Sequence, residues 1–145
     1  MTQGEVKDIG LLYLIDRCGG IQTRIRLQKF VCIAQFTKGG KTPFSFNFHS
    51  HYYGPYSENL RKSVDQLVAR NLVRENVVFH DHGGDDPTYS FVYDLTKEGK
   101  IFLGRTVSEI QKFIPTIDAV ITKFGGLSNG AVIQMAKRVS GMESV

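Results

Sequence analysis

The chain has little of what marks disulfide-rich, membrane-spanning or exported proteins. Only two of its 145 residues are cysteines, Cys18 and Cys32, too few for a disulfide framework. No apolar run approaches the roughly 18 residues that a membrane-spanning helix needs. The first residues, Met1 to Asp8, lack the cationic stretch and apolar run of a secretion signal. We therefore expect a cytoplasmic protein without membrane contact, whose two thiols are small, buried hydrophobic side chains.

Signatures of catalysis are also missing. The sequence contains neither GxGxxG nor GxSxG, and its acidic residues do not pair within any predicted buried face. The stretch from Gly40 to Thr42 is similar to the end of a phosphate-binding loop, but that motif requires glycine where Gln35 stands. The expected order of strand and helix around it is reversed as well. We expect a protein that is not an enzyme and holds no cofactor.

Composition indicates one folded domain with an uneven distribution of charge. Hydrophobic residues make up 41% of the chain, and no repeat, linker or low-complexity segment divides it, so we assign one domain to residues 1–145. The net charge is +4. Residues 1–74 hold eleven Lys or Arg and five Asp or Glu (+6), whereas residues 75–145 hold seven and nine (−2). This asymmetry favours an anionic partner for the first half, or it reflects an ordinary solvated surface.

Two helices are predicted in the first third of the chain. The first covers about Val6 to Arg17, and the second runs from about Thr23, an N-cap residue, to Lys38. The inward stripe of the second helix follows i, i+3, i+4, i+7 spacing and consists of Leu27, Phe30, Val31 and Ala34.

The hydrophobic period then changes from helical to alternating. Phe44, Phe46 and Phe48 alternate with polar residues, which predicts a strand with one buried face. The turn residues Tyr53-Gly54-Pro55 end this strand. Ser57 can then cap a helix whose inward stripe consists of Leu60, Val64, Leu67 and Val68.

A hairpin and further helices are predicted for the second half. The strands run from Val77 to His80 and from Tyr89 to Leu95, joined by a loop over residues 81–87. Helices follow from the caps Thr96 and Ser128, the latter reaching about Val139. Another helix covers residues 116–123, after Pro115 has broken or restarted the helical pattern.

This order of elements predicts an α+β fold with a winged helix-turn-helix-like core, a β-hairpin wing and extra C-terminal helices. The passage from Tyr93 through Leu95 and Thr96 to Gly99 supports the comparison, because winged helices often leave the wing by an aromatic-x-Leu-Thr-x-x-Gly junction. In such a junction the last core residue of the strand directly precedes a helix N-cap.

Several short motifs are spread along the chain: RLQK at residues 26–29 with AQ at 34–35, YGP at 53–55, and IDAV at 117–120 with FG at 124–125 and LS at 127–128. In this order they resemble the motifs of the Panacea domain, a family of antitoxins in toxin–antitoxin pairs. The longer stretch from His51 to Leu60 is similar to the YwgA-like prokaryotic proteins. The resemblance assigns family-motif positions to Leu27, Gln28, Lys29, Tyr53, Gly54, Pro55 and Asp118. The Panacea family includes members that act through contacts with other proteins, so the resemblance does not by itself imply DNA binding.

The helix after Ser57 is the candidate recognition helix for nucleic acid. Its outward face presents side chains of the kind that read base edges or bind phosphate, and the preceding helix adds further cations. The predicted nucleic-acid-binding residues are Arg24, Arg26, Lys29, Asn59, Arg61, Lys62 and Gln66. Against this, Glu58 and Asp65 share the outward face, and the hairpin loop carries Asp81, Asp85 and Asp86, which phosphate would repel.

Two hypotheses about function therefore stay open. The first is a cytosolic DNA-binding regulator of the winged-helix type. The second is a protein-binding antitoxin or adaptor of the Panacea type.

Two His-x-His pairs and a run of apolar residues complete the list of candidate sites. His49 with His51, and His80 with His82, could each chelate a metal from one strand face. A structural zinc site usually needs four ligands, however, and the two cysteines form no CxxC pattern that would complete one. We expect no metal and regard these histidines as polar residues of a strand face. A homodimer could form through C-terminal helices, over the apolar residues Ile114, Ile117, Val120, Ile121 and Phe124.

Overall fold

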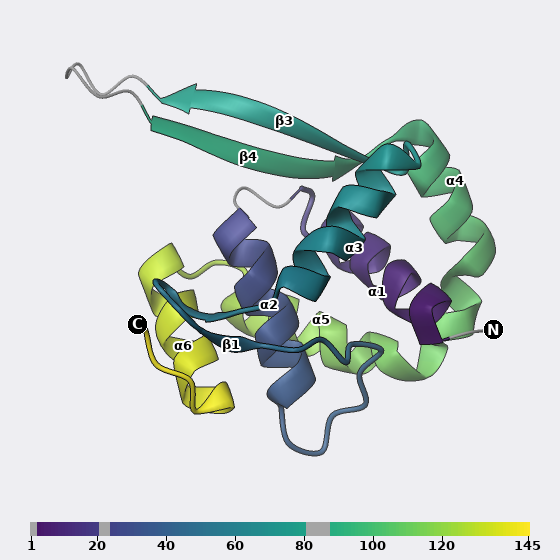
Figure 1. Ribbon diagram of the computed structural model, residues 1–145. Helices are drawn as coiled ribbons and strands as arrows, with labels where there is room; N and C mark the ends of the chain where they lie inside the picture. Colours follow the sequence, from purple (N-terminus) through teal and green to yellow (C-terminus); the bar gives the residue numbers. More distant parts are fainter. Residues whose placement is uncertain (1–2, 21–23, 81–87) are drawn as a thin grey trace.

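The structure is a computed structural model that describes residues 3–20, 24–80 and 88–145 (Figure 1). These residues form six α-helices, a 3₁₀ segment and two antiparallel hairpins, which confirms the predicted α+β class. In chain order the elements are α1 (Gln3–Arg17), α2 (Arg24–Phe36), β1 (His49–His51), β2 (Gly54–Tyr56), α3 (Glu58–Ala69), β3 (Val73–His80), β4 (Thr88–Leu95), α4 (Lys97–Thr106), η1 (Val107–Phe113), α5 (Ile114–Phe124) and α6 (Asn129–Ser140). None of the helices in these residues has the length and hydropathy to cross a membrane.

The predicted helix starts are confirmed by their capping bonds. Ser57 Oγ accepts from Leu60 N at 3.2 Å, Thr96 Oγ1 accepts from Gly99 N at 2.9 Å, and Ser128 Oγ accepts from Ala131 N at 3.2 Å. Each bond satisfies one of the backbone N–H groups that a helix leaves unpaired in its first turn. The remaining predicted cap, Thr23, lies outside the described residues.

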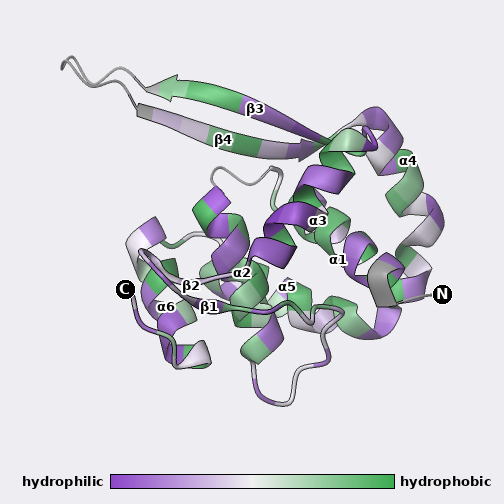
Figure 2. Ribbon diagram, in the orientation of Figure 1, coloured by the Kyte–Doolittle hydropathy of each residue, from purple (hydrophilic) through white to green (hydrophobic). Residues whose placement is uncertain are grey.

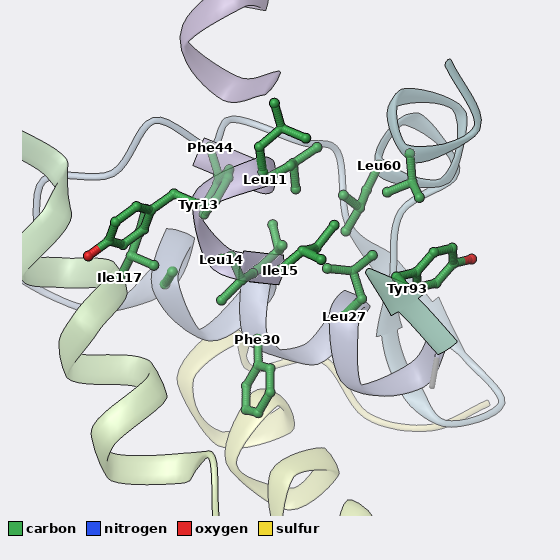
Figure 3. Close-up of a cluster of buried hydrophobic side chains, with 14 of the residues drawn as sticks. Leu11, Tyr13, Leu14, Ile15, Leu27, Phe30, Phe44, Leu60, Tyr93 and Ile117 are labelled. Carbon is green, nitrogen blue, oxygen red and sulfur yellow. The ribbon is translucent and has the colours of Figure 1, made fainter. Parts of the chain in front are cut away.

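The core is built around α1 and α2 (Figure 3). The predicted inward stripe of α2 is buried, and so are other residues of that helix, including Gln28, Lys29 and Cys32. Burial extends around α2 because β2, β4, α5 and α6 all pack against it. Cys32 is buried and Cys18 half-buried, and both are free thiols. Burial raises the pKa of the Cys32 thiol to about 12, as expected for a small hydrophobic core residue.

The strand predicted around Phe44, Phe46 and Phe48 is wrong. Phe44 and Phe46 are buried and Phe48 is half-buried, as the alternation predicted, but this segment pairs with no strand in the described residues. The side chain of Gln35 takes the place of a strand partner, because Phe46 N donates to Gln35 Oε1 at 2.8 Å and Gln35 Nε2 donates to Phe46 O at 2.9 Å. A period of two thus identified extended backbone with a buried face, but not a sheet.

The turn also lies earlier than predicted. Strand β1 starts at His49, and Gly54 and Pro55 belong to β2, which pairs with β1 in the register His51↔Gly54 and His49↔Tyr56. The chain therefore reverses through Tyr52 and Tyr53. Gly54 follows with φ of +89°, a backbone conformation that favours glycine.

The hairpin of β3 and β4 is confirmed and is longer than predicted. Strand β3 begins at Val73 rather than Val77, and its register with β4 pairs Val73 with Leu95 and Phe79 with Tyr89. Its inner end enters the core, whereas its outer end projects away from the helices (Figure 1).

The C-terminal helices pack against the body of the domain. Pro115 lies in the first turn of α5, where the absence of an N–H costs nothing, so it restarts the helix as predicted. Ile117, Val120 and Phe124, named above as a possible dimer surface, are core residues here. Ile114 and Ile121 are half-buried.

Candidate functional site

The residues of the LQK and YGP motifs lie side by side and hold the start of α3. Gln28 Nε2 donates to Ser57 O at 2.8 Å, and Ser57 N donates to Gln28 Oε1 at 2.9 Å. Lys29 Nζ donates to Pro55 O at 2.6 Å. Gln28 and Lys29 are 5% and 2% exposed, so their side chains bond to the backbone of this chain and are shielded from solvent. The motif thereby positions the cap Ser57 and, with it, the first turn of α3.

Lys29 is a buried cation. Burial, with a smaller contribution from the nearby cation Lys137, lowers the pKa of its ammonium to about 8. The described residues show no ion pair with Lys29. This environment leaves the ammonium mostly charged at neutral pH but more easily deprotonated than a lysine in water.

Helix α3 presents the predicted polar face. Leu60, Val64 and Leu67 are at most 1% exposed, which confirms most of the inward stripe, whereas Val68 is half-buried. Asn59, Lys62, Gln66 and the two acids Glu58 and Asp65 are exposed on the outside. Arg61 is half-buried and donates from Nε to Asp65 Oδ1 at 3.2 Å. The outward face therefore carries mixed charge.

The predicted phosphate ligands of α2 are engaged within the chain. Arg24 donates from Nε to Tyr93 Oη and from Nη2 to Glu75 Oε1, each at 3.1 Å, and its guanidinium lies 3.4 Å from the centroid of the Phe91 ring. The Glu75 oxygen that does not pair with Arg24, Oε2, is buried without a hydrogen-bond partner. Arg24 thus links α2 to the base of the long hairpin.

Arg26 is also bonded within the chain, to residues at the turn between α5 and α6. Its Nη1 donates to Leu127 O and Asn129 Oδ1 at 2.9 Å each, and its Nη2 donates to Gly125 O at 3.1 Å. These contacts tie the turn between α5 and α6 to α2. Of the seven predicted residues, Arg24, Lys29 and Arg61 line one pocket between α2 and α3, whereas Arg26 faces the α5–α6 turn. Asn59, Lys62 and Gln66 lie on the exposed face of α3, so the structure does not bring all seven into one surface.

Asp118 of the IDAV motif accepts a hydrogen bond from α1. Tyr13 Oη donates to Asp118 Oδ1 at 2.7 Å, and Arg17 Nε lies 3.9 Å from the same oxygen. Burial is the largest cause, and this hydrogen bond to a carboxylate the second, of a rise in the pKa of Tyr13 to about 12. The aspartate thus anchors α5 to α1.

The histidines of β1 share a strand face and lie beside the ring of Tyr56. The ring centroids of His49 and His51 lie 6.0 Å apart, and His51 stacks on Tyr56 at 4.8 Å. Across residues 3–20, 24–80 and 88–145, no three residues among His, Cys, Asp and Glu gather as metal ligands would. His82 lies outside the described residues, as do Asp81, Asp85 and Asp86, and only the backbone of His80 is described.

Sequence reasoning missed an apolar surface on the long hairpin. Val77, Phe79 and Tyr89 are 58%, 54% and 61% exposed. The register pairs Val77 with Phe91 and Phe79 with Tyr89, so all four share one face, which we call the hairpin patch. Figure 2 shows the hydrophobic outer half of β3, and Figure 1 shows it projecting beyond the helices. The signal in the sequence is the unbroken apolar run Val77-Val78-Phe79, which places hydrophobic side chains on both faces of the strand.

Comparison with known proteins finds a relative by sequence. The chain is similar to "Uncharacterized protein YwgA" of Bacillus subtilis (strain 168), with 31% identity over 110 residues. The match covers 76% of this chain and 61% of that protein, so the chain spans about three fifths of its relative. This confirms the expected similarity to YwgA. No family model matches the chain.

Proposed function

We propose that the protein is a non-enzymatic binding module that recognises another protein through the hairpin patch. The observation that supports this most is the exposure of Val77, Phe79 and Tyr89 at the outer end of the long hairpin. Exposed apolar clusters are a common mark of protein-binding sites. The Panacea resemblance suggests an antitoxin or adaptor acting in the cytoplasm.

The chemistry of the patch suits a protein partner better than nucleic acid. Its residues are aromatic or branched aliphatic, with the Arg24 guanidinium stacked on Phe91 at the inner end. Aromatic residues and arginine are enriched among the side chains that dominate protein interfaces, and aliphatic surface gains nothing from phosphate. The partner should therefore present an apolar surface to the hairpin.

Replacing both outer aromatic residues should abolish partner binding. In the double variant Phe79→Ser with Tyr89→Ser, we expect the affinity for the partner to fall at least about 30-fold, because each aromatic anchor of an interface contributes roughly 2 kcal/mol. The partner would first be captured from a native extract with the wild-type protein, and its binding then measured with purified components. Thermal unfolding would verify that the variant remains folded.

The neighbouring Val78 provides a matched control. It follows Val77 in β3 and points to the opposite face, so Val78→Ser should leave the affinity within about twofold of the wild type. Equal affinity of the double variant and the wild type would contradict the proposal. Light scattering would show whether the captured partner is a second copy of this chain.

A second candidate function is DNA binding by a winged-helix arrangement. The supporting observation is that α3, with Asn59, Lys62 and Gln66 exposed, directly precedes a long hairpin. Lys62 is the only predicted cation that is fully exposed there, since Arg61 pairs with Asp65. With so few free cations, the face would neutralise few phosphates.

A gel shift with mixed-sequence duplex across a salt series tests this candidate. If α3 binds DNA, the logarithm of affinity should fall with the logarithm of salt by about 0.9 for each phosphate neutralised. Lys62→Glu should then weaken binding, whereas the hairpin double variant should not. Absence of duplex binding at low salt would remove this candidate and leave the protein-binding proposal untouched.

A further inference from the structure

A small pocket lies between α2, α3 and the β1–β2 hairpin, beside the inner end of β4. Its volume is about 150 Å³, and its lining includes Leu27, Leu60, Val64, Tyr56 and Tyr93. Figure 3 shows Leu27, Leu60 and Tyr93 converging in this region. An apolar cavity of about this volume holds a benzene ring. The pocket is thus of the right size and polarity for one small hydrocarbon group.

The charged residues that line the pocket are all cations. They are Arg24, Lys29 and Arg61, and the described lining contains no aspartate or glutamate. Arg24 and Arg61 are neutralised by Glu75 and Asp65, at 3.1 and 3.2 Å. Lys29 is therefore the cation of the pocket for which the described residues provide no acidic partner.

Lys29 carries a charge that its structural role does not need. An ammonium has three N–H donors, and the bond from Lys29 Nζ to Pro55 O uses one of them. That bond needs one N–H donor but no charge, and burying a charge at 2% exposure costs free energy. A bound anion would offset that cost and accept the remaining donors.

We propose that this pocket binds a small organic acid, whose carboxylate pairs with Lys29 and whose apolar body occupies the space beside Leu60 and Val64. The ligand class follows from the combination of one uncompensated cation with apolar and aromatic walls. The volume limits the body to about a six-membered ring. The ligand would contact α3 and β4 together, the two elements that present the polar helix face and the hairpin patch.

The pH dependence of binding follows from the surroundings of Lys29. Its ammonium has a pKa of about 8, so the charge that attracts a carboxylate is lost as pH rises through that value. Affinity should therefore be constant near neutral pH and fall above about pH 8. The other ionisable groups around it are Cys32, Lys137, Arg24, Arg61, His51, Tyr53, Tyr56 and Tyr93.

Sodium benzoate is a suitable probe, with neutral benzamide as its isosteric control. Calorimetry at constant ionic strength should show saturable binding of benzoate near neutral pH, at least about tenfold weaker binding of benzamide, and a loss of benzoate affinity at about pH 9.5. Chemical-shift changes should map to Leu60, Val64 and Tyr93. No benzoate binding to the folded protein, or equal binding of benzamide, would overturn the proposal.

Two variants test separately the charge of Lys29 and the free volume of the pocket. Lys29→Gln retains a donor for Pro55 O but removes the charge, and Val64→Phe fills the pocket while Lys29 stays in place. Each should weaken benzoate binding at least about tenfold, whereas Lys100→Gln, on the exposed surface of α4, should leave it unchanged. If Lys29→Gln fails to fold, Val64→Phe and the benzamide comparison still decide. Undiminished binding by a folded Lys29→Gln would show that the ligand is elsewhere.

Discussion

Substitution of Gly99 by alanine is expected to destabilise the domain by more than about 4 kcal/mol. A Cβ at this position would lie 2.0 Å from Leu72 O and 2.9 Å from Leu72 C, and both are backbone atoms that cannot rotate away. The N-terminus of α4 would have to move from the turn between α3 and β3. That movement would break the bond from Thr96 N to Leu72 O and the bond from Thr96 Oγ1 to Asn71 O, which are 3.1 and 2.6 Å long.

Gly104 in the same helix provides the control. It is exposed, and a Cβ there would meet no atom within 4 Å. Gly104→Ala should therefore stabilise the protein by about 0.5 to 1 kcal/mol, the usual difference in helix propensity. Urea titration of both variants would measure the free energies of unfolding. If Gly99→Ala and Gly104→Ala changed the free energy of unfolding in the same direction, Gly99 could not be packed closely against Leu72.

Replacement of Gln28 by leucine is expected to cost about 2 to 4 kcal/mol. The variant keeps the volume of the side chain but leaves Ser57 N, a fully buried donor, without its acceptor. Ser57 O retains one partner, because it also accepts from Arg61 N at 3.2 Å. The estimate therefore counts one buried unsatisfied group and one lost hydrogen bond.

Hydrogen exchange would test whether the loss is local to the start of α3. In Gln28→Leu, the amides of Leu60 and Arg61 should exchange faster than those at the C-terminal end of the helix, because Ser57 no longer holds its position as the cap. Gln66→Leu, on the exposed face of α3, should change stability by less than about 0.5 kcal/mol. A cost below about 1 kcal/mol for Gln28→Leu would show that the LQK motif does not support the turn.

The local elements of the fold were predictable because their signals are local. The caps Ser57, Thr96 and Ser128 act on N–H groups two or three residues away, so the sequence alone identifies them. The inward stripe of α3 follows from helical geometry in the same way. The error at Phe44 to Phe48 has the opposite origin, since an extended segment with a buried face becomes a strand only if another strand lies beside it. Here the amide of Gln35 lies there instead.

The candidate sites were less predictable, because they depend on which charges remain exposed. Arg24, Arg26 and Lys29 are side chains of the kind that bind phosphate. Each instead donates a hydrogen bond to a residue of the same chain that is at least 26 residues away in sequence. The reverse holds for Phe79 and Tyr89, whose hydrophobic alternation indicates burial although the core ends before it reaches them. Neither outcome follows from helical or strand periodicity.

By itself the sequence determined where α3, α4 and α6 begin, which face of α3 turns inward, and that a hairpin follows α3, since these depend on contacts between near neighbours. Only the tertiary structure decided what the motif residues do. It placed Gln28 and Lys29 against the backbone of residues 55–57, closed Gly99 over Leu72, and left the outer hairpin uncovered. The physical reason is that burial is a property of the surroundings of a residue, and distant parts of the chain supply those surroundings.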